Sequence, residues 1–280
     1  MDNSEKIKLN PRKIFLKCGT CSRAMYHLLN HEFDNISPDE EKASDLLAGG
    51  IAMKGHQCGM LWGGALAIGS ESFRRYSNIN EATAAAINAS KYLIESFRRR
   101  AGTVNCRDIT KVNWEKKSHL VVFFLKTVAQ GFVFSPCFNF MNKWTSEAIQ
   151  AANKGLSEIS VQGNPCLSCA AEVVKKMGAS DEVSATVAGL AGGIGLSGNG
   201  CGALSAVIWY KMLEWGKGNP GKTPTNNPEV KEILKIFYNQ TSSEMLCHKI
   251  SGRRFTTISD HTEYVKNGGC RNLLDALAKA

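Results

Sequence analysis

A fifteen-residue pattern that occurs twice constrains this chain more than any other feature. The pattern reads LAGGI-x3-G-x2-CG-x-L, and it spans Leu47–Leu61 and again Leu190–Leu204 without a gap. Each copy carries a cysteine at the same place, Cys58 in the first and Cys201 in the second. Chance composition does not produce such a match, so the sequence indicates a tandem duplication built around these two cysteines.

The length of the chain agrees with two related halves. The 280 residues could form one large domain or two smaller ones, since domains of about 100 to 200 residues are usual. We expect a first repeat over residues 1–155 and a second over residues 156–280. A repeated sequence also suggests that the halves pack about a pseudo-twofold axis.

The local patterns predict an all-α protein, a helical bundle of two pseudo-symmetric repeats. Ser37, Pro38 and Glu40 form a helix-start signal with a capping box, and this helix should run to about Met53, where glycines take over. Other helices are expected after the matched cysteines, while Val121–Phe124 is the only run that invites a strand assignment. The helices are expected over residues 21–31, 58–76, 80–100, 119 onward, 137–153, 169–177, 201–215, 228–240 and 270 onward.

The glycines of the repeated pattern allow two interpretations. Gly49, Gly50 and Gly55 could provide backbone with positive φ close to a bulky group, or they could allow close packing of helices. The two interpretations are compatible.

All ten cysteines have a counterpart in the other half. This complete correspondence, among side chains that have otherwise changed, favours a chemical role over simple burial. The matched sets are Cys18, Cys21, Cys58, Cys106 and Cys137 against Cys166, Cys169, Cys201, Cys247 and Cys270.

Charge and hydropathy exclude several other classes. The net charge is +9, but the basic residues are dispersed and no aromatic–basic ladder accompanies them, so we expect no nucleic-acid partner. No secretory signal and no apolar stretch of about eighteen residues is found, so we expect no membrane span and a cytoplasmic location. In a reducing compartment, thiols serve more often as metal ligands or redox groups than as structural disulfides.

The spacing and the glycine-rich core resemble the family of redox-active proteins named for the pattern C-GCAxxG-C-C. The chain is similar to two fused copies of such a protein over nearly all its length. The core differs from the pattern, since Gly59 and Gly202 replace its alanine and Trp62 and Ser205 replace its last glycine. The pattern's four cysteines fall on Cys21, Cys58, Cys106 and Cys137 and on Cys169, Cys201, Cys247 and Cys270.

The resemblance implies redox work, and four thiolates per half match the ligands of a [4Fe–4S] or [2Fe–2S] cluster. We therefore expect these eight cysteines to be metal ligands, and the protein to transfer electrons to or from a redox partner protein. Glycine amides at Gly55, Gly59, Gly198 and Gly202 are expected to hydrogen-bond the cofactor. A homodimer is a further possibility.

Two other hypotheses remain open at this stage. In a thiol–disulfide oxidoreductase, the CxxC pairs Cys18/Cys21 and Cys166/Cys169 would be the reactive groups, because a thiolate at a helix N-terminus has a lowered pKa. In a structural zinc protein, each set of four thiolates would stabilise a small helical half.

Overall fold

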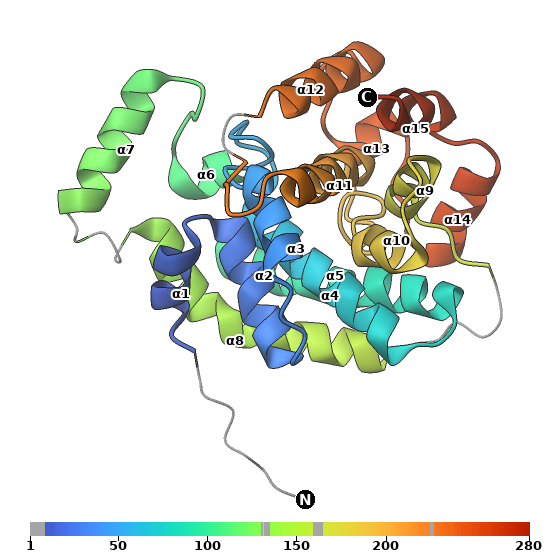
Figure 1. Ribbon diagram of the computed structural model, residues 1–280, viewed down its shortest axis with the longest axis horizontal. Helices are drawn as coiled ribbons and strands as arrows, with labels where there is room; N and C mark the ends of the chain where they lie inside the picture. Colours follow the sequence, from blue (N-terminus) through green and yellow to red (C-terminus); the bar gives the residue numbers. More distant parts are fainter. Residues whose placement is uncertain (1–8, 130, 132–134, 159–164, 225–226) are drawn as a thin grey trace, which may run out of the picture.

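The protein is an assembly of helices, shown in Figure 1 as a computed structural model that describes residues 9–129, 131, 135–158, 165–224 and 227–280. The first half contains α1 (Pro11–Cys18), α2 (Cys21–Glu32), α3 (Pro38–Ala43), the 3-10 helix η1 (Ser44–Leu47), α4 (Gly59–Arg75), α5 (Ile79–Ala101), α6 (Cys106–Thr110), α7 (Lys117–Ala129) and α8 (Pro136–Ser157). The second half contains α9 (Cys169–Lys176), α10 (Asp181–Ala188), α11 (Gly202–Gly218), α12 (Pro228–Thr241), α13 (Cys247–Ile250), α14 (Ile258–Lys266) and α15 (Arg271–Ala278).

The all-α prediction is confirmed. Within the described ranges, the extended structure consists of two isolated β-bridges, Gln57 with Asn105 and Gly200 with Leu246. The strand-like run Val121–Phe124 lies in α7. None of the described helices is long and apolar enough to cross a bilayer.

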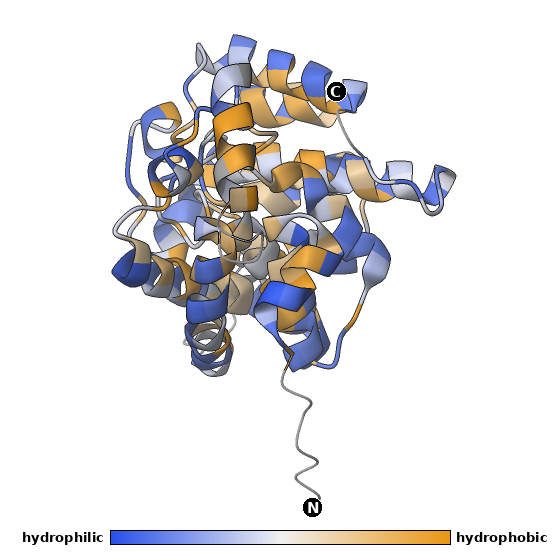
Figure 2. Cartoon of the chain, turned by 90° about the vertical axis from the view of Figure 1, so that its left-hand side faces the viewer, coloured by the Kyte–Doolittle hydropathy of each residue, from blue (hydrophilic) through white to orange (hydrophobic). Residues whose placement is uncertain are grey.

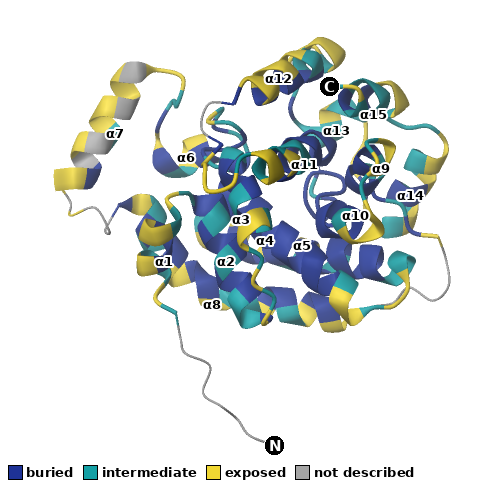
Figure 3. Ribbon diagram, viewed as in Figure 1, coloured by how far each residue is buried: buried dark blue, intermediate teal, exposed yellow. Residues whose placement is uncertain are grey.

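The core lies between the two halves, around α4 and its neighbours. Helix α4 is buried along most of its length between α2, α5 and α10 (Figure 3). Hydrophobic residues gather between the helices, and hydrophilic residues cover most outer faces (Figure 2). One hydrophobic cluster draws buried residues from both repeats, so each repeat covers apolar surface of the other.

The contacts between the halves are reciprocal. Helix α4 of the first half packs on α10, while the corresponding α11 of the second half packs on α3 and η1. The α4–α10 approach is so close that a Cβ on Gly69 would lie 2.1 Å from the carbonyl oxygen of Thr186. At the other contact, Trp209 donates its indole N–H to the carbonyl oxygen of Glu40 at 3.0 Å. This exchange of equivalent elements supports the pseudo-twofold arrangement.

Each copy of the glycine pattern forms a left-handed turn rather than the end of a helix. Residues 49–53 all have positive φ, between 47° and 76°, and residues 192–196 do so again, between 52° and 84°. The first turn includes Ile51, Ala52 and Met53, and for such non-glycine residues this conformation costs about 1–2 kcal/mol each. Strain of this kind, kept in both halves, points to a position at which the backbone path itself is needed.

This turn corrects the prediction that the helix after Ser37 runs to about Met53. Helix α3 ends at Ala43, η1 ends at Leu47, and the chain then reverses its hand. The predicted capping box is also wrong, because the Ser37 side chain accepts no hydrogen bond at the helix start. Its counterpart Ser180 does cap α10, accepting from the N–H of Val183.

The glycines in these turns are required by sterics. A Cβ on Gly50 would lie 2.4 Å from the backbone nitrogen of His56, and one on Gly193 would lie 2.6 Å from the carbonyl oxygen of Gly200. Positive φ close to other backbone is therefore the interpretation that fits Gly50 and Gly193, because the atoms they meet belong to the following loop and not to a packed helix.

The two turns meet at the centre of the molecule through Gln57. Its side-chain amide donates to the carbonyl oxygen of Gly193 at 3.3 Å, and its side-chain oxygen accepts from the N–H of Gly200 at 3.0 Å. A single side chain of the first half therefore bonds the backbone of the second glycine pattern at two points, within its turn and just before Cys201.

Two candidate thiol centres

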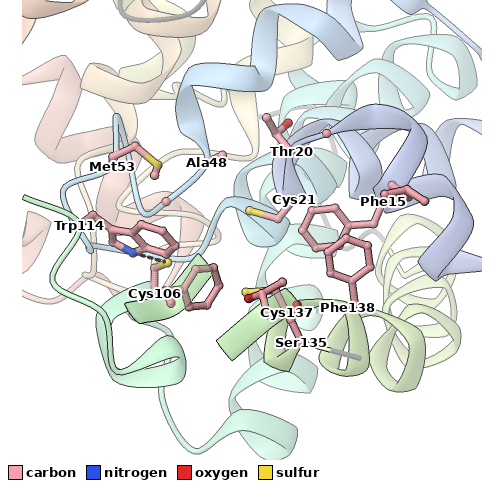
Figure 4. Close-up of a pocket in the computed structure, with 15 residues that line it drawn as sticks. Phe15, Thr20, Cys21, Ala48, Met53, Cys106, Trp114, Ser135, Cys137 and Phe138 are labelled. Carbon is pink, nitrogen blue, oxygen red and sulfur yellow. Dashed lines mark hydrogen bonds between the residues drawn. The ribbon is translucent and has the colours of Figure 1, made fainter. Parts of the chain in front are cut away.

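The first centre gathers four thiols from four separate elements. Cys21 begins α2, Cys58 precedes α4, Cys106 begins α6 and Cys137 lies in the first turn of α8. Each of these four thiols acts electrostatically on at least one other member of the set. Figure 4 shows the side chains of Cys21, Cys106 and Cys137 around one space.

Cys21 and Cys58 are the hydrogen-bonded pair of the first centre. The Cys58 thiol donates a hydrogen bond to the Cys21 sulfur, and this bond lowers the pKa of Cys21. The same interaction, together with burial, raises the pKa of Cys58 well above its usual range. Cys21 is therefore the thiol of this centre that loses its proton first.

The glycine turn supports Cys21 directly. The backbone N–H of Gly49 hydrogen-bonds the Cys21 sulfur and also lowers the pKa of that thiol. Gly59 lies against the same sulfur, since a Cβ at this position would stand 2.7 Å from it. The left-handed path thus positions an amide donor and leaves room for the thiol.

Cys106, which is buried, and Cys137, which is half-buried, complete the first centre as protonated thiols. Burial and the neighbouring Cys21 raise the pKa of Cys106 to about 12, and the same causes raise that of Cys137 well above its usual range. Trp114 donates its indole N–H to the Cys106 sulfur at 3.3 Å and partly offsets this effect.

The second centre repeats the arrangement with Cys169, Cys201, Cys247 and Cys270. Burial raises the pKa of both Cys169 and Cys201 to about 12, with a smaller contribution from the neighbouring thiols. Burial also raises the pKa of Cys247 well above its usual range, and the other three thiols of this set act on it in the same direction. Each half therefore builds its own set of four from its own cysteines.

Hydrogen bonds to sulfur recur in the second centre from equivalent backbone. The N–H of Gly192 bonds the Cys169 sulfur, as Gly49 does for Cys21. The side-chain donor is different: burial raises the pKa of Cys270, and the hydroxyl of Tyr264, 3.5 Å from the Cys270 sulfur, partly offsets this effect. The amides of Gly49 and Gly192 were missed by sequence reasoning, although the repeated Gly-Gly was the signal that could have found them.

The CxxC partners lie apart from both centres. The charged groups that act on the Cys18 thiol are Arg23, Glu41, Asp45 and Lys17, and burial raises its pKa to about 11. Burial likewise raises the pKa of Cys166 to about 11, and its thiol bonds Thr262. The structure thus brings together the four family cysteines of each half and leaves the fifth outside.

The remaining candidate glycines have different surroundings. Gly202 packs on the backbone of Leu190, where a Cβ would stand 1.9 Å from the carbonyl oxygen. Gly55 lies against the side chain of Arg107, and Gly198 lies against that of His248. Gly55 and Gly198 lie in loops that pair with α6 and α13. The backbone N–H of Arg107 in α6 donates to the carbonyl oxygen of Gly55, and that of His248 in α13 donates to the carbonyl oxygen of Gly198, both at 3.1 Å.

A cavity of about 330 Å³ opens beside the first centre. Three thiols of the first centre line one side of this cavity, namely Cys21, Cys106 and Cys137. The other sides are mainly apolar, and the rings that line them are Phe15, Trp114, Phe123 and Phe138.

The thiol sets do not have the geometry of a preformed mononuclear site. Among the described residues, no group of three or more His, Cys, Asp or Glu side chains is placed to hold one metal ion. A single tetrahedral zinc with bonds of about 2.3 Å would draw its sulfurs to within about 4 Å of one another. Binding of one zinc ion would therefore require the described side chains to rearrange.

The comparisons with known proteins define the class of this protein. The chain matches the family described as "Putative redox-active protein (C_GCAxxG_C_C)" over residues 19–144 and 165–280, so it belongs to that family and carries two copies of its domain. The two matched ranges lie on either side of the boundary expected after residue 155. No curated protein and no solved structure matches the chain.

Proposed function

We propose that each half binds one iron–sulfur cluster through its four family cysteines and that the protein transfers electrons. The observation that carries this proposal is the convergence, in both halves, of four buried or half-buried thiols from four separate elements. Membership of a redox-active family supports the electron-transfer role.

The chemistry of the donor set fits such a cofactor. Four thiolates are the usual ligands of both common cluster types. Buried thiolates without a counter-charge are costly, and this cost keeps the pKa of Cys106, Cys169 and Cys201 near 12. Cationic iron removes that cost, so binding should displace protons from these thiols.

The residues around the thiols would orient them and adjust their basicity. Gly49 and Gly192 direct backbone N–H groups at the first sulfur of each set. Trp114 and Tyr264 bring side-chain donors to a later sulfur of the set. When bound, a cluster would supply one-electron transfer, and hydrogen bonds to its ligand sulfurs are among the features that set its potential.

The proposal is tested by anaerobic reconstitution of the full chain with iron and sulfide. We expect brown protein with visible absorption that bleaches on reduction, and iron and sulfide bound to both halves. A colourless product without iron after careful reconstitution would contradict the proposal.

A second function is favoured by the hydrogen bond between Cys58 and Cys21, which is a pairing that the CxxC hypothesis did not include. In a thiol–disulfide oxidoreductase, the Cys21 thiolate would be the reactive group and Cys58 its partner. Mild oxidation of metal-free protein followed by peptide mapping separates the two versions. A Cys21–Cys58 disulfide supports the structural pair, a Cys18–Cys21 disulfide supports the CxxC pair, and unchanged thiols oppose both.

Structural zinc remains the third hypothesis. Four thiolates per half would also satisfy one tetrahedral zinc ion. Zinc content without any redox response would support the zinc hypothesis instead.

A further inference from the structure

The cavity beside the first centre has a lining that a cluster alone does not require. Cluster ligation needs thiolates and amide donors, which are gathered at one end of this space. The rest of the wall consists of aromatic and aliphatic groups, including Phe15, Leu16, Trp114 and Phe123. This outer part is therefore available to a second molecule.

The lining specifies the kind of molecule that would fit. No charged side chain is found among the described residues that line the cavity, in a protein whose net charge is +9. Entry of a carboxylate or phosphate would leave that charge without a partner in an apolar space, which is costly. Hydroxyl groups of Thr127 and Ser135 line the cavity and can donate to a neutral carbonyl oxygen, whereas the Thr20 hydroxyl already donates to Asp45 at 2.7 Å.

Helix α7 forms the outer wall of the cavity. Phe123 and Thr127 face the cavity, and the Phe123 ring meets Trp114 edge-on with 5.2 Å between ring centroids. Among the described residues, α7 packs only weakly on the other helices, and it extends from the body in Figure 1. The Trp114–Phe123 contact therefore joins this wall to the residue that donates a hydrogen bond to Cys106.

From these observations we infer that the cavity binds a neutral quinone-type molecule, with its ring among the aromatic side chains and its edge toward the first thiol centre. The volume of about 330 Å³ lies within the range of small-molecule sites. The choice of a quinone among neutral ring compounds rests on the proposed electron-transfer function, whereas the apolar character of the ligand rests on the cavity alone.

Duroquinone is a suitable probe because its ring is fully substituted and does not alkylate thiols. Binding to the full chain is measured by equilibrium dialysis, both before and after iron–sulfur reconstitution. We expect saturable binding of duroquinone and at least tenfold weaker binding of the charged anthraquinone-2-sulfonate at physiological salt.

Two substitutions on the same helix provide matched variants. Phe123→Ala removes a ring that lines the cavity and should weaken duroquinone binding about tenfold. Leu125→Ala changes an exposed side chain of α7 that does not line the cavity and should leave binding unchanged. Circular dichroism of both variants shows whether the helical fold is kept.

The inference is overturned if duroquinone does not bind in a saturable way, if the sulfonate binds equally well, or if the two variants have equal affinity. Binding to metal-free protein that cannot be reconstituted would support the cavity assignment while contradicting the cluster proposal. Reconstituted protein that does not bind duroquinone would do the opposite.

Discussion

The two thiol centres share their framework but differ in how they are covered. Both place a cysteine at the start of a helix under the amide of a left-handed glycine turn, through Gly49 in one half and Gly192 in the other. The first is covered by Trp114, an aromatic cavity and the projecting α7. The second is covered by the short α14 and its Tyr264.

This difference shows which part of the duplicated unit was free to change. The segment between the last two cysteines of each set supplies the cover, and α7 and α14 differ in length. The four thiols and the glycine turn are the same in both halves. We therefore assign the thiol chemistry to the four cysteines and the glycine turn, and ligand access to the segment between the last two cysteines of each set.

The largest expected effect concerns the cover of the second centre, where His261 is buried and its ring packs on Phe255. Its Nδ1–H donates to the carbonyl oxygen of Leu167 at 3.1 Å, and burial lowers its pKa from 6.5 to about 4. The folded state therefore takes up this proton only at a lower pH than the unfolded state does. The contribution of His261 to stability is fully present above pH 6.5 and is lost as the pH falls toward 4.

We expect the wild-type protein to lose about 2–3 kcal/mol more than His261→Asn between pH 7 and pH 4.5. Urea unfolding at both pH values measures this difference. Asn keeps a donor for Leu167 but does not titrate. Equal pH dependence of the two proteins would contradict the burial of a neutral His261 in the segment that covers the second centre.

The next effect distinguishes two glycines of helix α11, Gly202 and Gly216. Gly202→Ala would place a methyl group 1.9 Å from the carbonyl oxygen of Leu190 and should lower the free energy of unfolding by about 2 kcal/mol. Gly216→Ala in the same helix meets no atom within 4 Å and should be neutral or stabilising. Equal stabilities of the two variants in urea would contradict the close packing at Gly202.

Gly59→Ala should act on chemistry as well as on stability. Its methyl group would lie 2.7 Å from the Cys21 sulfur, so this thiol must move away from the Cys58 donor. We therefore expect slower alkylation of Cys21 in Gly59→Ala than in wild-type protein, measured by peptide mass spectrometry on metal-free samples at neutral pH. An unchanged rate would show that Gly59 does not position Cys21.

The smallest effect distinguishes the two side-chain donors. Trp114→Phe removes a donor that lowers the pKa of Cys106, and Tyr264→Phe removes one that lowers the pKa of Cys270. Each hydrogen bond is worth about 1 kcal/mol, so its loss should slow alkylation severalfold, at Cys106 in Trp114→Phe and at Cys270 in Tyr264→Phe. The same mapping measures both, and slowing in the opposite half would contradict two separate centres.

The sequence predicted the framework well because the duplication repeats it. Helical periodicity and the matched cysteines located α4, α5, α9 and α11 within a few residues, and they grouped the thiols that the structure gathers. The glycine pattern also indicated positive φ. These features depend on local sequence and on a comparison of the two halves.

The features that the sequence did not predict depend on tertiary contacts. Ile51, Ala52 and Met53 are ordinary helix formers, and their left-handed conformation is held by packing rather than by their own preference. Trp114 and Tyr264 have no counterparts in the other half, so comparison of the repeats could not indicate them. Helices α1 and α14 were also not predicted.

The most direct test of two independent clusters is the iron and sulfide content of single cysteine variants after anaerobic reconstitution. We predict that Cys58→Ser and Cys201→Ser each lose about half of the bound iron and sulfide, while Cys18→Ser and Cys166→Ser keep the wild-type amount. Unchanged iron in Cys58→Ser and Cys201→Ser would contradict the account, and so would complete loss of iron from either one.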